Sequence, residues 1–120
     1  MPGAELNLIV LRSIDLERSA RFYGALGIAF VRERHGNGPE HFAGEVGRIV
    51  FEIYPHGTGE ATVKTRIGFS VDSLSALIPE LQEAGGTVVS LPQESPWGMR
   101  AVVADPDGHR VELIERDENC

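Results

Sequence analysis

The sequence has little cysteine, few basic residues and no long apolar run. Its one cysteine, Cys120, is the last residue and has no partner for an internal disulfide, so we expect an untethered thiol and no oxidising compartment. Eleven Lys and Arg stand against eighteen Asp and Glu, and the formal net charge is -7. This charge argues against binding to nucleic acid or to an anionic membrane, because both attract basic surfaces.

No stretch approaches the ~20 apolar residues of a membrane span. The first residues, Met-Pro-Gly-Ala-Glu, lack the basic and apolar regions of a signal peptide. We therefore expect a cytoplasmic protein with neither nucleic acid nor membrane as a partner. The apolar content of 42% is ordinary for a globular protein, and a chain of 120 residues is long enough for one compact domain.

Apolar and alternating runs predict eight strands, and two stretches with helical spacing predict two helices. Asp15 is a suitable N-cap for the first helix, which Gly27 would end, and Asp72 or Ser73 is suitable for the second. Pro79 lacks a helix donor, so it either kinks the second helix or limits its regular part. The expected strands cover residues 6–11, 28–34, 40–45, 48–54, 63–71, 87–91, 97–104 and 109–115, with a linker at 55–62 and a loop at 92–96.

The order strand, helix, three strands occurs twice, and the two halves also resemble each other in sequence. Ser-Ile-Asp at 13–15 corresponds to Ser-Val-Asp at 70–72, and residues 49–53 correspond to 109–113. Such a repeat predicts a duplicated module in which each half needs a second layer to cover its sheet. We therefore predict an α+β fold, with one domain over residues 1–120.

The last strand of each predicted module carries one acid between apolar neighbours. Glu112 lies between Val111 and Leu113, and the repeat pairs it with Glu52. A carboxylate in such a strand needs a metal ion, a cation or exposure to water. Before Glu112, a turn of Asp-Pro-Asp-Gly begins at Asp105, whose side chain can cap the turn.

Several segments are similar to one family over residues 5–116. They are Asp15-Leu16-Glu17-Arg18-Ser19, Phe22-Tyr23, Leu26-Gly27, Phe51-Glu52-Ile53 and Asp105-Pro106-Asp107-Gly108-His109-Arg110-Val111-Glu112-Leu113. The chain resembles the vicinal oxygen chelate superfamily of glyoxalases, bleomycin-resistance proteins and extradiol dioxygenases. The resemblance implies two tandem βαβββ modules, at about 5–55 and 63–116, that form a cupped, mostly antiparallel, eight-stranded sheet surface. It also implies a homodimer, often with pockets built from modules of both chains.

In metal-dependent members of this family, the first and last strands of each half supply the ligands of a divalent ion. The resemblance assigns these positions to Leu8, Glu52, Arg66 and Glu112. Leucine has no donor atom, and the fixed positive charge of Arg66 would repel a divalent ion. We therefore expect no metal cofactor, and Ni, Zn, Fe or Mn is the alternative. Arg66 can instead act as the counterion of the acids.

Two functions remain open, and the sequence does not decide whether the protein is an enzyme. The first is binding of a small organic ligand in the sheet cup without a catalytic metal, with pocket residues Leu8, Glu52, Arg66, Trp97, Arg100 and Glu112. The alternative is a metal-dependent or metal-free lyase, isomerase or dioxygenase, in which Glu52 or Glu112 would be the general base.

The remaining candidate side chains each have two interpretations. His35 and His41 bracket a Gly-Asn-Gly-Pro loop, where two solvated histidines are expected more often than a metal clip. His56 is expected in the linker and His109 at the edge of the final hairpin. Trp97 should open a strand, either as a core or interface aromatic or as a ligand contact. Arg100 either receives an anionic ligand or forms a surface ion pair.

Overall fold

A computed structural model of the protein describes residues 3, 5–57, 62 and 65–116. The expected free thiol of Cys120, linker positions 58–61 and the first two residues of the strand predicted at 63–71 lie outside the described residues. No helix in the described part of the chain is long and apolar enough to cross a bilayer.

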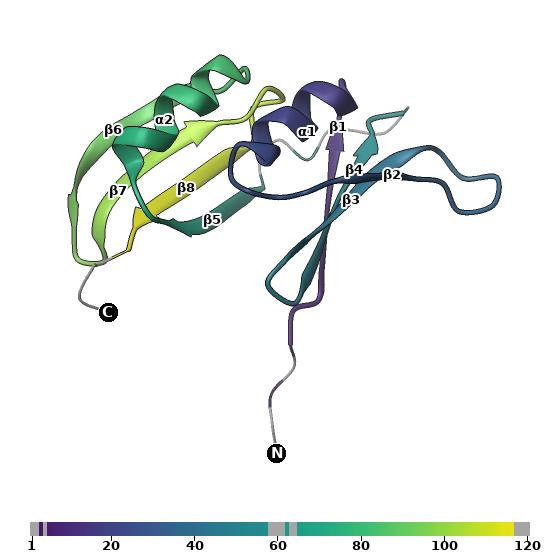
Figure 1. The fold of residues 1–120 in the computed structure, drawn as a ribbon, viewed down its shortest axis with the longest axis horizontal. Coiled ribbons are helices and arrows are strands. Elements are labelled where there is room, and N and C mark those ends of the chain that lie inside the picture. Colours follow the sequence, from purple (N-terminus) through teal and green to yellow (C-terminus); the bar gives the residue numbers. More distant parts are fainter. Residues whose placement is uncertain (1–2, 4, 58–61, 63–64, 117–120) are drawn as a thin grey trace.

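Two βαβββ modules follow one another, which confirms the predicted fold class (Figure 1). Hydrogen bonds divide the eight strands into two four-stranded sheets, in the orders β1-β4-β3-β2 and β5-β8-β7-β6. In the described part of the chain, β1–β4 and β5–β8 pair in parallel and the other strand pairs are antiparallel, so the sheets are mostly antiparallel, as expected. The first module contains β1 (Leu8–Ser13), α1 (Leu16–Gly24), β2 (Val31–Glu33), β3 (His41–Val46) and β4 (Ile49–Pro55). The second contains β5 (Arg66–Val71), α2 (Leu74–Glu83), β6 (Thr87–Ser95), β7 (Gly98–Ala104) and β8 (Arg110–Glu115).

Both helices begin at the caps that the sequence favours. The Asp15 carboxylate accepts from the backbone N–H of Arg18 at 3.1 Å, and Ser73, rather than Asp72, caps α2. Pro79 lies inside α2, and the helix continues past it to Glu83. The first helix ends at Gly24, earlier than predicted, and Gly27 has a φ of 97° in the turn that follows.

Two strand predictions were wrong in extent. The predicted loop at 92–96 is largely strand, because β6 continues to Ser95. Register shifts between Val88 and Ser90 and between Ser90 and Gln93 interrupt its pairing with β7, and such irregularities accommodate a proline that has no N–H to donate. The predicted strand at 28–34 is reduced to the three residues of β2.

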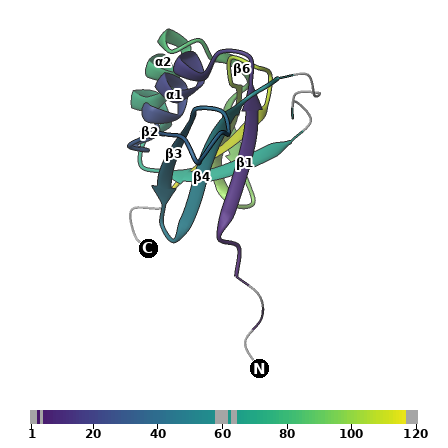
Figure 2. The same ribbon diagram turned by 90° about the vertical axis from the view of Figure 1, so that its right-hand side faces the viewer.

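One hydrophobic core spans both modules, and the aromatic side chains of α1 lie at its centre. The Tyr23 ring centroid is 4.9 Å from that of Phe51 in the first sheet and 6.5 Å from that of Phe69 in the second. Figure 2 shows α1 and α2 on the same side of the molecule. The helix-covered faces of the sheets therefore hold the modules together, and the opposite faces remain available.

Strand alternation fixes which residues lie on these available faces. Phe51 and Ile53 point into the core, so Val50, Glu52 and Tyr54 point to the other side of β4. In the same way, Val111 and Leu113 are buried against the helix layer, and Glu112 lies on the opposite face of β8. We call the helix-free sides the open faces of the two sheets.

Candidate functional site

Glu52 and Glu112 occupy equivalent positions on the two open faces. Glu52 pairs with Val10, the third residue of β1, and Glu112 pairs with Gly68, the third residue of β5. Leu8 and Arg66 begin these two strands and, by alternation, share a face with Val10 and Gly68. Each module therefore places one residue of its first strand and one of its last strand on the same open face.

The open face of the second sheet carries an arginine–glutamate cluster. Arg100 Nε donates to Glu112 Oε1 at 2.5 Å, and Arg66 Nη1 lies 3.8 Å from Glu112 Oε2. The hydrogen bond from Arg100, helped by the positive charges of Arg100 and Arg66, lowers the pKa of Glu112 although desolvation opposes this shift. Glu112 is therefore held as a carboxylate, and a carboxylate with a lowered pKa is a poor general base at neutral pH.

The open face of the first sheet combines a cavity with exposed apolar side chains. The cavity has a volume of about 660 Å³, and Glu52, only 15% exposed, reaches it. Leu8 is 48% exposed, and Val31 and Val50 are also exposed on this face. The lining residues are Gly27, Ala29, Val31, Glu33, Ala43, Gly44, Glu45, Val50 and Glu52.

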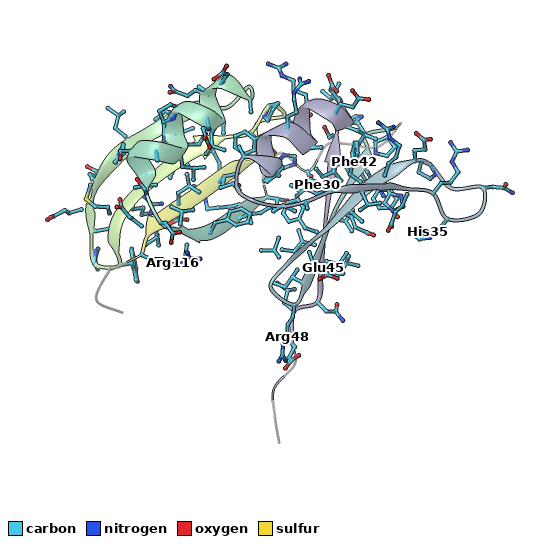
Figure 3. The ribbon with its side chains drawn as sticks, viewed as in Figure 1. Phe30, His35, Phe42, Glu45, Arg48 and Arg116 are labelled. Atoms are coloured by element: carbon cyan, nitrogen blue, oxygen red, sulfur yellow. The ribbon has the colours of Figure 1, made fainter. Side chains whose placement is uncertain are left out.

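The expectation of two solvated loop histidines was wrong for His41. His41 lies in β3, is 1% exposed, and its ring stacks on that of Tyr54 with centroids 4.1 Å apart and planes at 8°. His35 is exposed beside the loop between β2 and β3 (Figure 3). The structure brings both histidines together with Glu33 and Glu52, whose ligand atoms all lie within 4.8 Å of one another.

Sequence reasoning missed Glu33 as a member of this cluster. The available signal was a hairpin whose ends, Glu33 and His41, pair directly across β2 and β3. Directly paired residues point to the same face of a sheet. Since Glu52 pairs with Ala43, two residues beyond His41, it shares that face as well.

The structure separates Trp97 from the protein core. Trp97 lies in the turn between β6 and β7 and is 70% exposed, so its interpretation as a core aromatic was wrong. Its backbone N–H donates to the Ser95 hydroxyl at 3.2 Å. Arg100 forms an ion pair with Glu112, as one of its two interpretations expected. Contact of either residue with a ligand stays a prediction.

The Asp-Pro-Asp-Gly turn forms a buried polar network instead of a ligand site. Asp105 Oδ1 accepts from the N–H groups of residues 107, 108 and 109 at 2.9 Å each, as the cap prediction required. His109 was expected at the hairpin edge but is buried, with Nδ1 2.7 Å from Asp105 Oδ2 and Nε2 2.6 Å from Thr62 Oγ1. Tyr23 donates to the same Asp105 oxygen at 2.7 Å.

This network has the contact order Thr62, His109, Asp105, and the Tyr23 hydroxyl also donates to the acid. Burial alone would raise the pKa of Asp105, but hydrogen bonds from His109 and Tyr23 outweigh it and lower that pKa. Burial and the nearby charge of Asp105 raise the pKa of Tyr23 far above its ordinary value. The network links α1 of the first module to the last turn of the second, which is a structural role.

The four family positions do not fit a divalent metal. Leu8 offers no donor atom, and the Glu112 carboxylate is already engaged by Arg100 and lies near the Arg66 guanidinium. Two carboxylates without neutral ligands are a poor site for a transition metal, which prefers three or four protein ligands.

Two βαβββ modules with equivalent acids on the open faces of two four-stranded sheets define the class of fold to which this chain belongs. The chain belongs to the Glyoxalase/Bleomycin resistance protein/Dioxygenase superfamily, whose model matches residues 5–113. This confirms the resemblance identified from the sequence.

Proteins with different names are similar to this chain. A lactoylglutathione lyase of Escherichia coli O157:H7 is 32% identical over 124 residues, which cover 91% of this chain and 90% of the relative. A lactoylglutathione lyase of Arabidopsis thaliana is 31% identical, but the chain spans only 43% of its length. An antibiotic binding protein from Streptomyces sp. CB03234 shares the fold, with a TM-score of 0.76 at 21% identity over 98% of this chain and 99% of that one.

Proposed function

We propose that this protein binds a small organic ligand on its open sheet faces, in the cytoplasm, without a metal ion at the family position. The observation that carries the proposal is the hydrogen bond between Arg100 and Glu112, with Arg66 nearby. The cations that balance this acid are side chains of the protein. Leu8 occupies another of the four family ligand positions, and there it offers an apolar contact instead of a metal ligand.

The ligand should have an apolar body and an anionic group. Exposed Leu8, Val31 and Val50 provide apolar contacts on the first sheet, beside a cavity of about 660 Å³. On the second sheet, Arg66, Arg100 and Arg110 share a face with the single acid Glu112. Because this face carries more guanidinium groups than carboxylates, it is a suitable partner for an acidic ligand. The antibiotic-binding relative supports a binding role for this fold.

We further propose a homodimer in which the open face of one sheet lies against the partner chain. Each four-stranded sheet is covered by helix on one face only, and the apolar side chains on the first open face need a cover. Light scattering coupled to size-exclusion chromatography tests this directly. A mass near twice 13.1 kDa is expected, and a monomer at micromolar concentrations would contradict it.

Ligand binding is tested by thermal shift and calorimetry. Metal-free bleomycin and a panel of aromatic carboxylic acids serve as probes, with wild-type protein and an Arg66→Met variant. We expect a stabilising acidic ligand whose affinity falls about tenfold in the variant, as the loss of one charge-assisted hydrogen bond predicts. The proposal fails if no probe in the panel stabilises the protein. It also fails if the probes that do bind have the same affinity for the wild type and for Arg66→Met.

A second candidate function is metal-dependent lyase activity, which the name of the Escherichia coli relative favours. In that case Glu52, whose carboxylate is not engaged by an arginine in the described structure, is the better candidate for the base. The assay is turnover of the hemithioacetal of methylglyoxal and glutathione with and without added Ni²⁺ or Zn²⁺. If the protein shows a metal-dependent rate and Glu112→Gln abolishes it, metal-dependent lyase activity becomes the better proposal.

A further inference from the structure

Four side chains near the end of the first sheet converge on one point. Glu33 comes from β2, His35 from the loop that follows, His41 from β3 and Glu52 from β4. The cluster differs from the family position in three of its four residues, and Glu52 belongs to both. Glu33 and Glu52 also line the cavity of about 660 Å³.

The separations within this cluster are too long for hydrogen bonds. His41 Nε2 lies 3.5 Å from Glu33 Oε1 and 3.7 Å from Glu52 Oε2, and His35 Nε2 lies 3.4 Å from Glu33 Oε1. Hydrogen bonds to oxygen span ~2.7–3.2 Å. Ligands bound tetrahedrally at ~2.0–2.1 Å from a zinc ion are ~3.3–3.4 Å apart. These three separations are thus close to those of atoms around a shared ion, and all four ligand atoms lie within 4.8 Å of one another.

The orientation of the His41 ring gives an independent reason for a cation. Its Nδ1 lies 3.3 Å from the carbonyl oxygen of Pro39, which can only accept, so this contact favours the tautomer in which Nδ1 carries the proton. In neutral His41, Nε2 then presents a lone pair toward two carboxylates. This nitrogen is buried and has no hydrogen-bond partner among the described residues. Such an atom requires a proton or a metal ion to balance the facing oxygens.

We propose that Glu33, His35, His41 and Glu52 bind one divalent first-row transition metal ion. Two imidazoles and two carboxylates are a ligand set that suits Zn²⁺ and its neighbours, and less so Mg²⁺ or Ca²⁺, which prefer oxygen alone. The Pro39 carbonyl orients His41, and the stacked Tyr54 ring holds it in place. His35, on the exposed loop, is the ligand most free to adjust its position.

This inference goes beyond the proposed function and does not depend on it. The ion would tie the β2–β3 hairpin to β4 at the border of the cavity. The arginine–glutamate cluster of the second sheet takes no part in it. Metal at this cluster is therefore compatible with a family position that holds none.

The test is Zn²⁺ binding to the full chain after removal of metal with EDTA, measured by competition with a chromophoric chelator. Co²⁺ is used in parallel, because its visible absorption reports nitrogen and oxygen ligation. Wild-type protein is compared with His35→Ala and Glu33→Gln, which alter partly exposed side chains and should leave the fold intact. His56→Ala, a histidine outside the cluster, and Glu112→Gln, at the family position, are the controls.

We expect one Zn²⁺ per chain, with affinity reduced by ~10–100-fold or more in His35→Ala and Glu33→Gln, since loss of an outer-shell partner alone costs that much. The two controls should bind as the wild type does. Absence of stoichiometric binding overturns the inference. Binding that is lost in Glu112→Gln but kept in His35→Ala also overturns it, and contradicts the metal-free family position as well.

Discussion

The Tyr23 hydroxyl of α1 donates a hydrogen bond of 2.7 Å to Asp105 Oδ2 in the turn before β8. The two residues belong to different modules and lie 82 positions apart in the chain. The same carboxylate oxygen is 2.7 Å from His109 Nδ1. One buried acid thus connects the helix of the first module to the final hairpin of the second.

Replacing Tyr23 with Phe should destabilise the protein by about 1.5–3 kcal/mol, because a hydrogen bond to a charged, buried acceptor is lost while the ring still fills its place. The measurement is the free energy of unfolding from denaturant titration. Tyr54→Phe is the matched control, since no hydrogen bond of the Tyr54 hydroxyl is found among the described residues. An equal loss of unfolding free energy in both variants would mean that the hydrogen bond from Tyr23 to Asp105 does not stabilise the protein.

Acidification should weaken the same network. The pKa of Asp105 in the folded protein is below its ordinary value of 3.8, so the unfolded chain binds its proton more readily. The stabilisation is therefore fully present above about pH 4 and is lost as the pH falls toward the folded-state pKa. The difference in unfolding free energy between wild type and Asp105→Asn should shrink over that acid range. A difference independent of pH would show that Asp105 does not titrate as described.

Arg100→Met should raise the pKa of Glu112 toward its ordinary value, because the hydrogen bond at 2.5 Å is the largest cause of the lowered pKa. Carboxyl NMR chemical shifts followed against pH report this directly. Arg66→Met should change the pKa in the same direction but by less, since its guanidinium is 3.8 Å away and more exposed. A larger effect from Arg66 would reverse the assigned roles.

Two glycine substitutions should have opposite effects on stability. A methyl group at Gly44 would lie 2.7 Å from Ile28 Cγ2 and 2.9 Å from the Ala29 carbonyl oxygen, so Gly44→Ala should destabilise by about 1–3 kcal/mol. Gly24 ends α1 with open space around it, and Gly24→Ala should stabilise by about 0.5–1 kcal/mol. Thermal unfolding of both variants measures the two effects. Stabilisation by Gly44→Ala would mean that the 28–30 segment can move away.

Local patterns in the sequence predicted most of the fold. Alternation and helical spacing identified both modules, and the caps at Asp15 and Ser73 follow from side chains that bond within three residues. The strand character of residues 92–95 was not predictable in this way. Pro92 and its polar neighbours are typical of a loop. They belong to the sheet through the irregular pairing of β6 with β7.

The candidate site was predicted where the internal repeat constrained it and missed where strand register decided it. The equivalence of Glu52 and Glu112 follows from two similar strands. The burial of His41 and its approach to Glu33 depend on how β2 pairs with β3 across an eight-position span. Contacts of this kind are set by tertiary packing, so composition alone suggested a solvated loop.

The equivalent placement of Glu52 and Glu112 gives the molecule an internal comparison. A gene duplication that produced two modules would have started with the same acid in the same surroundings in both. Arg66 and Arg100 now lie near Glu112, and His41 lies near Glu52. Exchanging the neighbours of Glu52 and Glu112 between the two modules would measure how many substitutions separate the surroundings of one acid from those of the other.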